Sequence, residues 1–207
     1  MSYLAVIGAG GHGKVVADAA FEMGCWSSII FYDDSVFVKE KCLDFKVVGT
    51  FKDLVSSVDK FDFVVAIGDN ALRLEKSKYL RSIGHNLVSV VHPSANISRY
   101  AHVGDGTVCL AGSIISAGSY LSEAVIVNTN ASVDHDCRVF DGVHICPGVK
   151  LAGNVEIGEC SWIGIGASVI QSTIIGKNVT VGAGSAVITN LSDGITAVGV
   201  PAKILKS

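Results

Sequence analysis

The spacing of the hydrophobic residues divides this chain of 207 residues into two halves. In the second half every sixth residue is aliphatic, and fifteen of sixteen such positions are Ile, Leu or Val. A repeat of this length predicts a parallel β-helix, in which each repeat is one short strand and one corner, and three repeats close a coil. The repeat positions are Ile97, Val103, Cys109, Ile115, Leu121, Val127, Val133, Val139, Ile145, Leu151, Ile157, Ile163, Val169, Ile175, Val181 and Val187.

Two further features follow the same period. Small side chains recur four residues after the aliphatic positions, as a narrow core requires: Ala101, Thr107, Ser113, Ser119, Ala131, Ser161, Ala167 and Ser185. Glycine and Asp gather where the corners are expected, because corners need a positive φ or a close backbone approach. These residues include Gly104, Asp105, Gly158, Gly164, Gly176 and Gly182. The period has no insertion, so we expect about five stacked coils.

A third set of apolar residues lies beside the repeat positions. Val125, Val143, Val155 and Val179 flank the aliphatic column. We expect them to form apolar strips on the outside of the β-helix, which a trimer would cover.

The first half has a different pattern, in which strand and helix signals alternate. We expect strands at 3–8, 28–32, 61–68 and 86–91, and helices at 14–24 and 70–84. This alternation predicts a parallel α/β sheet. The segment is only half the size of a full dinucleotide-binding domain. The prediction is therefore a Rossmann-like domain over 1–92, followed by a β-helix over 93–207.

Composition and charge narrow the class of protein. Apolar residues make up 49% of the chain and charged residues 17%, which suits a packed core. The net charge of −3 does not suggest a nucleic-acid partner. The short apolar run at the start ends in a glycine loop, and no apolar stretch is long enough to span a bilayer. Six cysteines lie scattered without paired motifs, so we expect reduced thiols in a cytoplasmic protein.

A glycine-rich loop follows the first predicted strand. Residues 8–13 read GAGGHG, which fits G-x-G-x-x-G between a strand and a helix, and Asp33 and Asp34 follow the next strand. This pattern is the usual dinucleotide fingerprint. Glycines at a helix N-terminus bind any phosphate, however, and only half of the dinucleotide fold is present. Purely structural glycines beside solvated acids remain the alternative.

These motifs together resemble a known family. The hexapeptide repeat and the tail GVPAK are similar to those of left-handed β-helix acyltransferases, over roughly 95–203. The whole chain, with GAGGHG, the paired Asp, IGDN and NTNASVDHDC, is similar to the bacterial family of sialic acid O-acetyltransferases and sugar-nucleotide N-acetyltransferases. The resemblance implies a trimer with an N-terminal sugar-nucleotide domain and acetyl-CoA bound on a left-handed β-helix.

The resemblance also implies the site residues. His135, between two acidic residues, matches the general base, and Asp136 its partner. Gly153 lies one coil further along and matches the donor to the thioester oxygen. The residues implied for acetyl-CoA are His144, Gly153, Ile165, Ala183, Pro201 and Lys203, and those for the substrate are Gly10, Gly11, His12, Gly13, Asp33, Asp34, Asp69 and Asn70. No metal is expected, because the histidines lack the spacing of β-helix zinc enzymes.

The function that the resemblance implies is acetyl-CoA-dependent N-acetylation of a UDP- or GDP-linked 4-amino-4,6-dideoxy sugar in bacterial surface glycan synthesis. Sialic acid O-acetylation is the alternative within the family. A nicotinamide-dependent sugar reductase is favoured by the glycine fingerprint and opposed by the missing half of the fold. A non-catalytic β-helix scaffold is opposed by His135 and its acidic neighbours.

Overall fold

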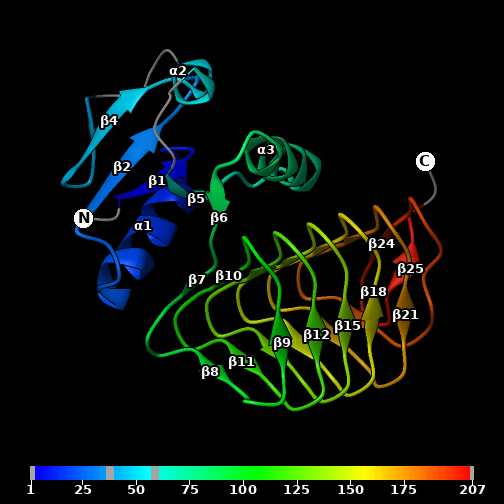
Figure 1. The fold of residues 1–207 in the computed structure, drawn as a ribbon. Coiled ribbons are helices and arrows are strands. Elements are labelled where there is room, and N and C mark those ends of the chain that lie inside the picture. The colour runs from blue at the N-terminus through cyan, green and yellow to red at the C-terminus, as the bar shows by residue number, and fades with distance from the viewer. Residues whose placement is uncertain (1–2, 36–39, 57–60, 206–207) are drawn as a thin grey trace.

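The computed structural model describes residues 3–35, 40–56 and 61–205, which form an N-terminal α/β domain and a β-helix (Figure 1). The N-terminal sheet has the order β3-β4-β2-β1-β5-β6 and is parallel except for the β3–β4 pair. Its elements are β1 (Tyr3–Ile7), α1 (Gly11–Met23), β2 (Ser28–Tyr32), β3 (Lys41–Cys42), β4 (Phe45–Gly49), α2 (Phe51–Val55), β5 (Asp62–Val65), α3 (Asn70–Ser82) and β6 (Asn86–Leu87). The sequence patterns did not predict β3, β4 or α2.

The end of the N-terminal domain differs from the prediction. The single strand expected at 86–91 is two strands in two sheets. The strand β6 pairs with β5, whereas β7 (Val90–Val91) pairs with β10 of the β-helix. The first strand of the β-helix therefore lies within the range 1–92 that we assigned to the N-terminal domain.

The β-helix consists of very short parallel strands that stack in three sheets. Its strands are β8 (Asn96–Ile97), β9 (His102–Val103), β10 (Val108–Cys109), β11 (Ile114–Ile115), β12 (Tyr120–Leu121), β13 (Ile126–Val127), β14 (Ser132–Val133), β15 (Arg138–Val139), β16 (His144–Ile145), β17 (Lys150–Leu151), β18 (Glu156–Ile157), β19 (Trp162–Ile163), β20 (Ser168–Val169), β21 (Ile174–Ile175), β22 (Thr180–Val181), β23 (Ala186–Val187), β24 (Thr196–Val198) and β25 (Lys203–Ile204). All pairs are parallel except β24–β25.

We name the three sheets as faces of a triangular prism. Face 1 contains β7, β10, β13, β16, β19, β22 and β24, with β25 at its end. Face 2 runs from β8 to β23 and face 3 from β9 to β21. Chain direction gives three edges, which we call corners 1–2, 2–3 and 3–1 after the faces that they join. Each corner lies opposite the third face, across the core.

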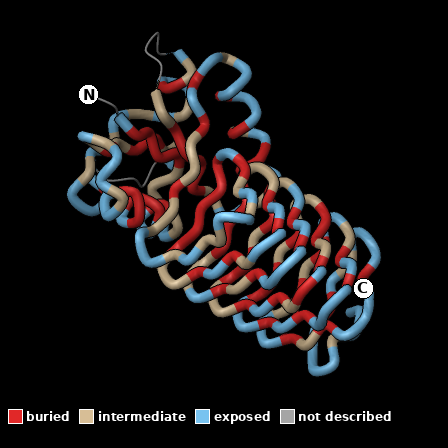
Figure 2. Tube along the Cα trace, turned by 60° about the horizontal axis from the view of Figure 1, so that its bottom comes forward, coloured by how far each residue is buried: buried red, intermediate tan, exposed pale blue. Residues whose placement is uncertain are grey.

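The aliphatic column fills this core, as the repeat predicts. Every repeat position from Cys109 to Val187 is at most 3% exposed, and the small residues after them are buried as well (Figure 2). The prediction for Val125, Val143, Val155 and Val179 is wrong, because all four are at most 1% exposed. They occupy the position of the small residues and point into the coil. The exposed aliphatic side chains of the β-helix instead include Ile114, Ile165, Ile170, Ile174 and Ile188.

The corners have a backbone regularity of their own. One residue in each repeat from Gly106 to Gly184 has a left-handed conformation, with φ between 53° and 75°. Seven of these fourteen residues are not glycine, and Asp136 and Cys160 are among them. The glycines singled out from the sequence serve the other purpose. A Cβ at Gly158, for example, would come within 2.6 Å of the backbone of Gly176 in the next coil.

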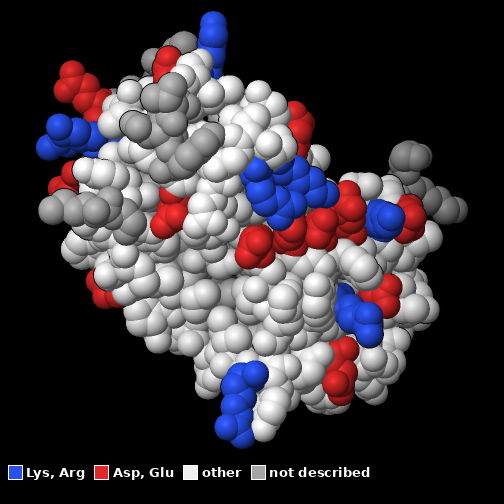
Figure 3. Space-filling view, in the orientation of Figure 1, with Lys and Arg blue, Asp and Glu red and all other residues white. Residues whose placement is uncertain are grey.

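The N-terminal domain packs on face 1 and on corner 3–1. Helix α1 joins Val90, Val108 and Leu110 in one hydrophobic cluster. Helix α3 lies along corner 3–1, where its basic residues meet acidic residues from successive coils (Figure 3). The ion pairs there are Lys78–Asp141 and Arg81–Glu123. No helix in the described part of the chain is long and apolar enough to cross a membrane.

Candidate active site

A histidine and a carboxylate form a hydrogen-bonded pair at corner 2–3, directly after β14. The distance from His135 Nδ1 to Asp136 Oδ2 is 2.9 Å, and the two side chains are 61% and 66% exposed. The hydrogen bond to Asp136 raises the pKa of His135 above its ordinary value, and the charge of Asp134 acts in the same direction. Asp136 is the left-handed residue of this corner, with φ of 59°. An exposed imidazole with raised basicity is suited to accept a proton.

Two glycines leave space for this pair. Gly153 lies one coil after His135, and a Cβ built on it would overlap with the imidazole at Nε2. Gly118 lies one coil before Asp136, and a Cβ there would overlap with the Asp136 carboxylate. The spacing of one coil from His135 predicted the place of Gly153. The same spacing before Asp136 leads to Gly118, which we did not predict.

The backbone N–H of Gly153 donates no hydrogen bond to any described residue, whereas its neighbour Asn154 donates to the His135 carbonyl at 2.8 Å. The Gly153 N–H is therefore available to an oxygen of a bound molecule, beside the imidazole. A pre-positioned backbone donor of this kind stabilises a developing oxyanion.

A second pair of histidines lies on face 1. His144 belongs to β16 and His12 to the first turn of α1, and their ring centroids are 6.1 Å apart. Burial, and secondarily the charge of Arg73, lowers the pKa of His144 to about 3 and that of His12 to about 4. Both rings are therefore neutral at neutral pH. His144 Nε2 lies 3.1 Å from the side-chain amide of Asn128.

The glycine loop that carries His12 is held by one of the predicted acids. The N–H of Ala9 donates to Asp33 Oδ2 at 2.6 Å. Gly13 packs so closely on the carbonyl of Gly8 that no Cβ fits there. By contrast, a Cβ at Gly10 or Gly11 meets no heavy atom within 4 Å. The outer side of the loop is thus open to a ligand, at the N-terminus of a helix of 13 residues.

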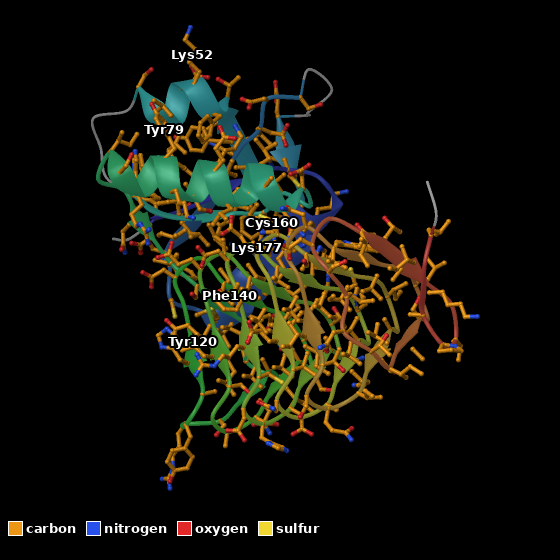
Figure 4. The ribbon with its side chains drawn as sticks, turned by 90° about the vertical axis from the view of Figure 1, so that its right-hand side faces the viewer. Lys52, Tyr79, Tyr120, Phe140, Cys160 and Lys177 are labelled. Carbon is orange, nitrogen blue, oxygen red and sulfur yellow. The ribbon has the colours of Figure 1, made fainter. Side chains whose placement is uncertain are left out.

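Asp34 lies beside a cavity of the N-terminal domain. It accepts a hydrogen bond from the Phe51 N–H at 2.8 Å and pairs with Lys76 at 3.4 Å. The cavity, of about 450 Å³, lies between α2 and α3, where Figure 4 labels Tyr79 and Lys52. Its lining includes Asp34, Phe51, Leu72, Lys76 and Tyr79, with the Lys76 ammonium 3.5 Å from the centre of the Phe51 ring.

The next two predicted substrate residues have structural partners. Asp69 caps α3 by accepting a hydrogen bond from the Leu72 N–H at 2.9 Å. The Asn70 amide donates to the carbonyls of Cys160 and Ser161 in the β-helix, and its oxygen accepts from Arg73. These contacts use both ends of the Asn70 side chain, so a substrate contact at Asn70, which stays a prediction, would have to share them.

The residues predicted to bind acetyl-CoA are divided between two edges of one chain. Gly153 lies at corner 2–3, whereas Ile165 and Ala183 lie one coil apart at corner 1–2. Lys203 pairs with Val198 beyond the last coil, next to Pro201. Face 2 separates these edges and bears a groove of about 540 Å³, whose lining includes Ser132, Asp134, Lys150, Ser168 and Gln171. Among the described residues, no group of three or more His, Cys, Asp or Glu is placed to hold a metal ion.

Known proteins share this two-domain architecture. Residues 3–80 match the family model described as the PglD N-terminal domain. The acetyltransferase domain of PglB from Neisseria gonorrhoeae is 44% identical, with a TM-score of 0.96 over 99% of this chain and 100% of that one. The chain belongs to the sugar-nucleotide N-acetyltransferase family of hexapeptide-repeat proteins. It is an acetyl-CoA-dependent acetyltransferase.

Two further relatives match over the whole chain. PerB from Caulobacter crescentus, solved in complex with CoA and GDP-perosamine, is 37% identical with a TM-score of 0.92, over 100% of this chain and 98% of that one. GDP-perosamine N-acetyltransferase from Escherichia coli O157:H7 is 28% identical over 100% of this chain and 97% of its own length.

Proposed function

We propose that this enzyme transfers the acetyl group of acetyl-CoA to the amine of a UDP- or GDP-linked 4-amino-4,6-dideoxy sugar, for bacterial surface glycans. The support is the joint presence of the His135–Asp136 pair, an open glycine loop and relatives that bind CoA together with GDP-perosamine. Such a reaction belongs in the compartment that supplies acetyl-CoA, the cytoplasm. The six cysteines, all free thiols, agree with that location.

The N-terminal domain supplies the nucleotide site in this proposal. The diphosphate lies on the open side of the loop at Gly10 and Gly11, where free N–H groups and the helix dipole favour an anion. The nucleobase of the substrate occupies the cavity between α2 and α3, against the aromatic rings of Phe51 and Tyr79. Asp34 lines this cavity and Asp33 holds the loop in place.

The chemistry follows from corner 2–3. The neutral amine of the sugar attacks the thioester carbonyl, and a C–N bond forms as the carbonyl oxygen becomes negative. His135 Nε2 accepts the proton from the nitrogen, while Nδ1 keeps its hydrogen bond to Asp136. The free N–H of Gly153 stabilises the oxyanion. The C–S bond then breaks, and the CoA thiolate leaves and recovers a proton.

One geometric observation carries the assignment of the site to two chains. His12 and the glycine loop lie outside face 1, whereas His135 lies at corner 2–3, the edge opposite face 1. The hydrophobic core fills the space between them. One chain therefore cannot bring its own amine to its own base. Corner 2–3 of one chain must meet face 1 and corner 1–2 of a neighbour, and a cyclic trimer provides three such sites.

The same arrangement accounts for the division of the acetyl-CoA residues. Gly153 and His135 come from one chain, while His144, Ile165 and Ala183 come from its neighbour. The exposed side chain of Ile165, which is 55% accessible in the single chain, would then contact the bound coenzyme or the neighbouring chain.

Mixed trimers test the two-chain site. His135→Ala removes the base, and Gly11→Phe fills the open side of the loop, where an added Cβ meets no heavy atom within 4 Å. Each variant alone should have little activity. Trimers refolded from an equal mixture should recover about a quarter of wild-type activity, since one interface in four pairs an intact base with an intact loop. No recovery in verified mixed trimers would show that each site is built from one chain.

The acceptor is identified by thiol release from acetyl-CoA in the presence of UDP-, GDP- and CMP-linked sugars. An amide product resists hydroxylamine, whereas an ester is cleaved, so the same assay separates N-acetylation from O-acetylation. Reaction only with hydroxyl acceptors would refute the proposed N-acetylation. Oxidation of NADH by a keto sugar would support the reductase alternative instead.

A further inference from the structure

Helix α3 meets corner 3–1 at one kind of backbone group. Ala124, Gly142 and Cys160 are the left-handed residues of three successive coils at this corner. Their N–H groups bond to the preceding coil, as in Gly142 N–H to the Glu123 carbonyl at 2.9 Å. Their own carbonyls take no part in this ladder and point outward. An unpaired carbonyl buried beneath a helix is unfavourable, so a donor is required there.

Arg73 of α3 provides these donors. Its Nε donates to the Ala124 carbonyl at 3.0 Å, and its Nη2 donates to the Gly142 carbonyl at 2.6 Å. Its Nη1 donates to the Ile67 carbonyl of its own domain at 3.0 Å, and Nη2 also to the Asn70 side chain at 2.9 Å. Asn70 extends the contact to the third coil through the Cys160 carbonyl at 3.0 Å. The fork of one guanidinium thus spans both domains.

Arg73 is 0% exposed, and burial lowers its pKa only to about 10, so it remains charged. Burying a guanidinium is costly, and neutral carbonyls compensate for that cost only in a specific geometry. An apolar side chain would fill the same space without requiring one particular alignment of the domains. The charge therefore argues for a role in orientation beyond the burial of area.

We propose that Arg73, with Asn70, is the positioning residue that fixes the nucleotide domain in one orientation on the β-helix. This inference rests on the proposed function, because the orientation places the amine relative to the thioester. It also accounts for the contact of His12 with His144, since α1 and α3 belong to one rigid sheet domain. Nucleotide binding within the N-terminal domain and acetyl-CoA binding on the β-helix do not depend on it.

Steady-state kinetics test this division. Arg73→Met should lower kcat by about 10- to 100-fold, because a misplacement of about 1 Å can cost that much. The dissociation constants of acetyl-CoA and of UDP or GDP, measured by calorimetry, should stay within about threefold. Arg73→Lys keeps the charge but loses the planar fork, and should give an intermediate kcat. The matched control is Arg81→Met, from the same helix and corner, whose exposed pair with Glu123 contributes little.

The reactivity of Cys160 gives a measurement that does not depend on activity. Cys160 lies beneath α3 (Figure 4), and its thiol packs near Gly142 and the Asn70 backbone. If Arg73→Met frees α3, iodoacetamide should label Cys160 faster in native trimers, as followed by peptide mass spectrometry. The exposed Cys25 is the internal reference. Loss of the Arg73 charge would by itself raise the pKa of the Cys160 thiol and slow the reaction, so faster labelling must come from exposure.

The outcomes separate the two proposals. If the wild-type protein labels slowly and Arg73→Met quickly, but no amino sugar is acetylated, the positioning role stands and the proposed function fails. If Arg73→Met matches Arg81→Met in kcat and in labelling, Arg73 has no positioning role. If Arg73→Met loses affinity for both ligands equally and has a lower Tm, Arg73 contributes only to overall stability, and the inference is wrong.

Discussion

Corners 3–1 and 2–3 repeat the same left-handed turn, yet their surroundings differ completely. At corner 3–1 helix α3 covers Ala124, Gly142 and Cys160, and Arg73 donates to the carbonyls of the first two. At corner 2–3 no described element covers His135 and Asp136, whose side chains are more than half exposed. The backbone turn of the repeat alone therefore does not determine which corner carries functional side chains. What differs is which side chains extend from the turn and what packs over them.

The difference also explains why chemistry and substrate are separated within one chain. The covered corner holds the domain that carries the glycine loop, and the open corner carries the proposed base. In the proposed two-chain site, a base that must receive an amine and a thioester has to remain accessible until a neighbouring chain completes the site. A buried histidine such as His144 loses basicity, whereas the exposed His135 gains it.

The largest expected effect is at the open corner. His135→Ala should lower kcat by about 10²- to 10⁴-fold with little change in either KM, because it removes the base without removing binding contacts. The exposed imidazole of His102, stacked on Tyr120 on face 3, is the control. His102→Ala should retain activity. If His135→Ala keeps more than about a third of kcat in intact trimers, the proton goes elsewhere.

Two glycines allow a comparison between chemistry and fold. Gly153→Ala puts a methyl group against the mobile end of the His135 side chain, so the ring moves and the backbone does not. We expect kcat to fall by about tenfold or more, with Tm nearly unchanged. Gly158→Ala puts its methyl group against the backbone of the next coil, which cannot move aside. It should lower Tm markedly.

Thermal unfolding followed by circular dichroism and kcat of the folded fraction measure both effects. A stability loss in Gly153→Ala as large as that in Gly158→Ala would mean that Gly153 is an ordinary corner glycine. In that case the position of the His135 ring would not depend on the missing side chain at Gly153.

The proximity of His135 and Gly153 could be predicted because it is local and periodic. Counting one coil from His135 reaches Gly153, and the structure brings them into contact. Each repeat has two positions whose side chains point into the core, and the period alone did not reveal the second one. Val125 and Val143, which fill this second position, were therefore predicted on the outside of the β-helix. A six-residue pattern records which side chains are apolar, but not how much room each inward position has.

The covered corner could not be predicted, because it depends on how two domains dock. Arg73 lies among apolar residues on α3 and reads as an ordinary charged residue of a surface helix. Its partners are backbone carbonyls 51 and 69 residues further along, which have no side-chain signal. The contact of Asn70 with the β-helix could not be predicted either, since its amide donates to the Cys160 carbonyl 90 residues further along.

Acid should weaken the covered side of the molecule. His12 and His144 have pKa values of about 4 and about 3 in the folded chain and near 6.5 when unfolded. Between these values the unfolded chain binds more protons, so stability falls as the pH drops below about 6.5. Each histidine accounts for about 2 kcal/mol at pH 5. Urea unfolding at pH 7 and pH 5 measures the change in the free energy of unfolding. In His144→Gln this free energy should depend clearly less on pH. An unchanged pH dependence in that variant would contradict the buried neutral pair.

The smallest expected effect separates orientation from basicity at the open corner. Asp136→Asn keeps a hydrogen-bond acceptor near His135 Nδ1, but it replaces the hydrogen bond to a charged carboxylate, which raises the pKa of the imidazole, with a weaker one to a neutral amide. The base must be neutral to act, so the rate rises with pH through the pKa of His135, above 6.5 in the wild type. In Asp136→Asn this limb should move to lower pH, while the plateau kcat falls by about tenfold or less, since a weaker base accepts the proton less readily. Because the two effects oppose each other, the variant should lose least activity, relative to the wild type, at the acid end of the profile. A limb that stays in place while the plateau falls would mean that Asp136 only orients the ring.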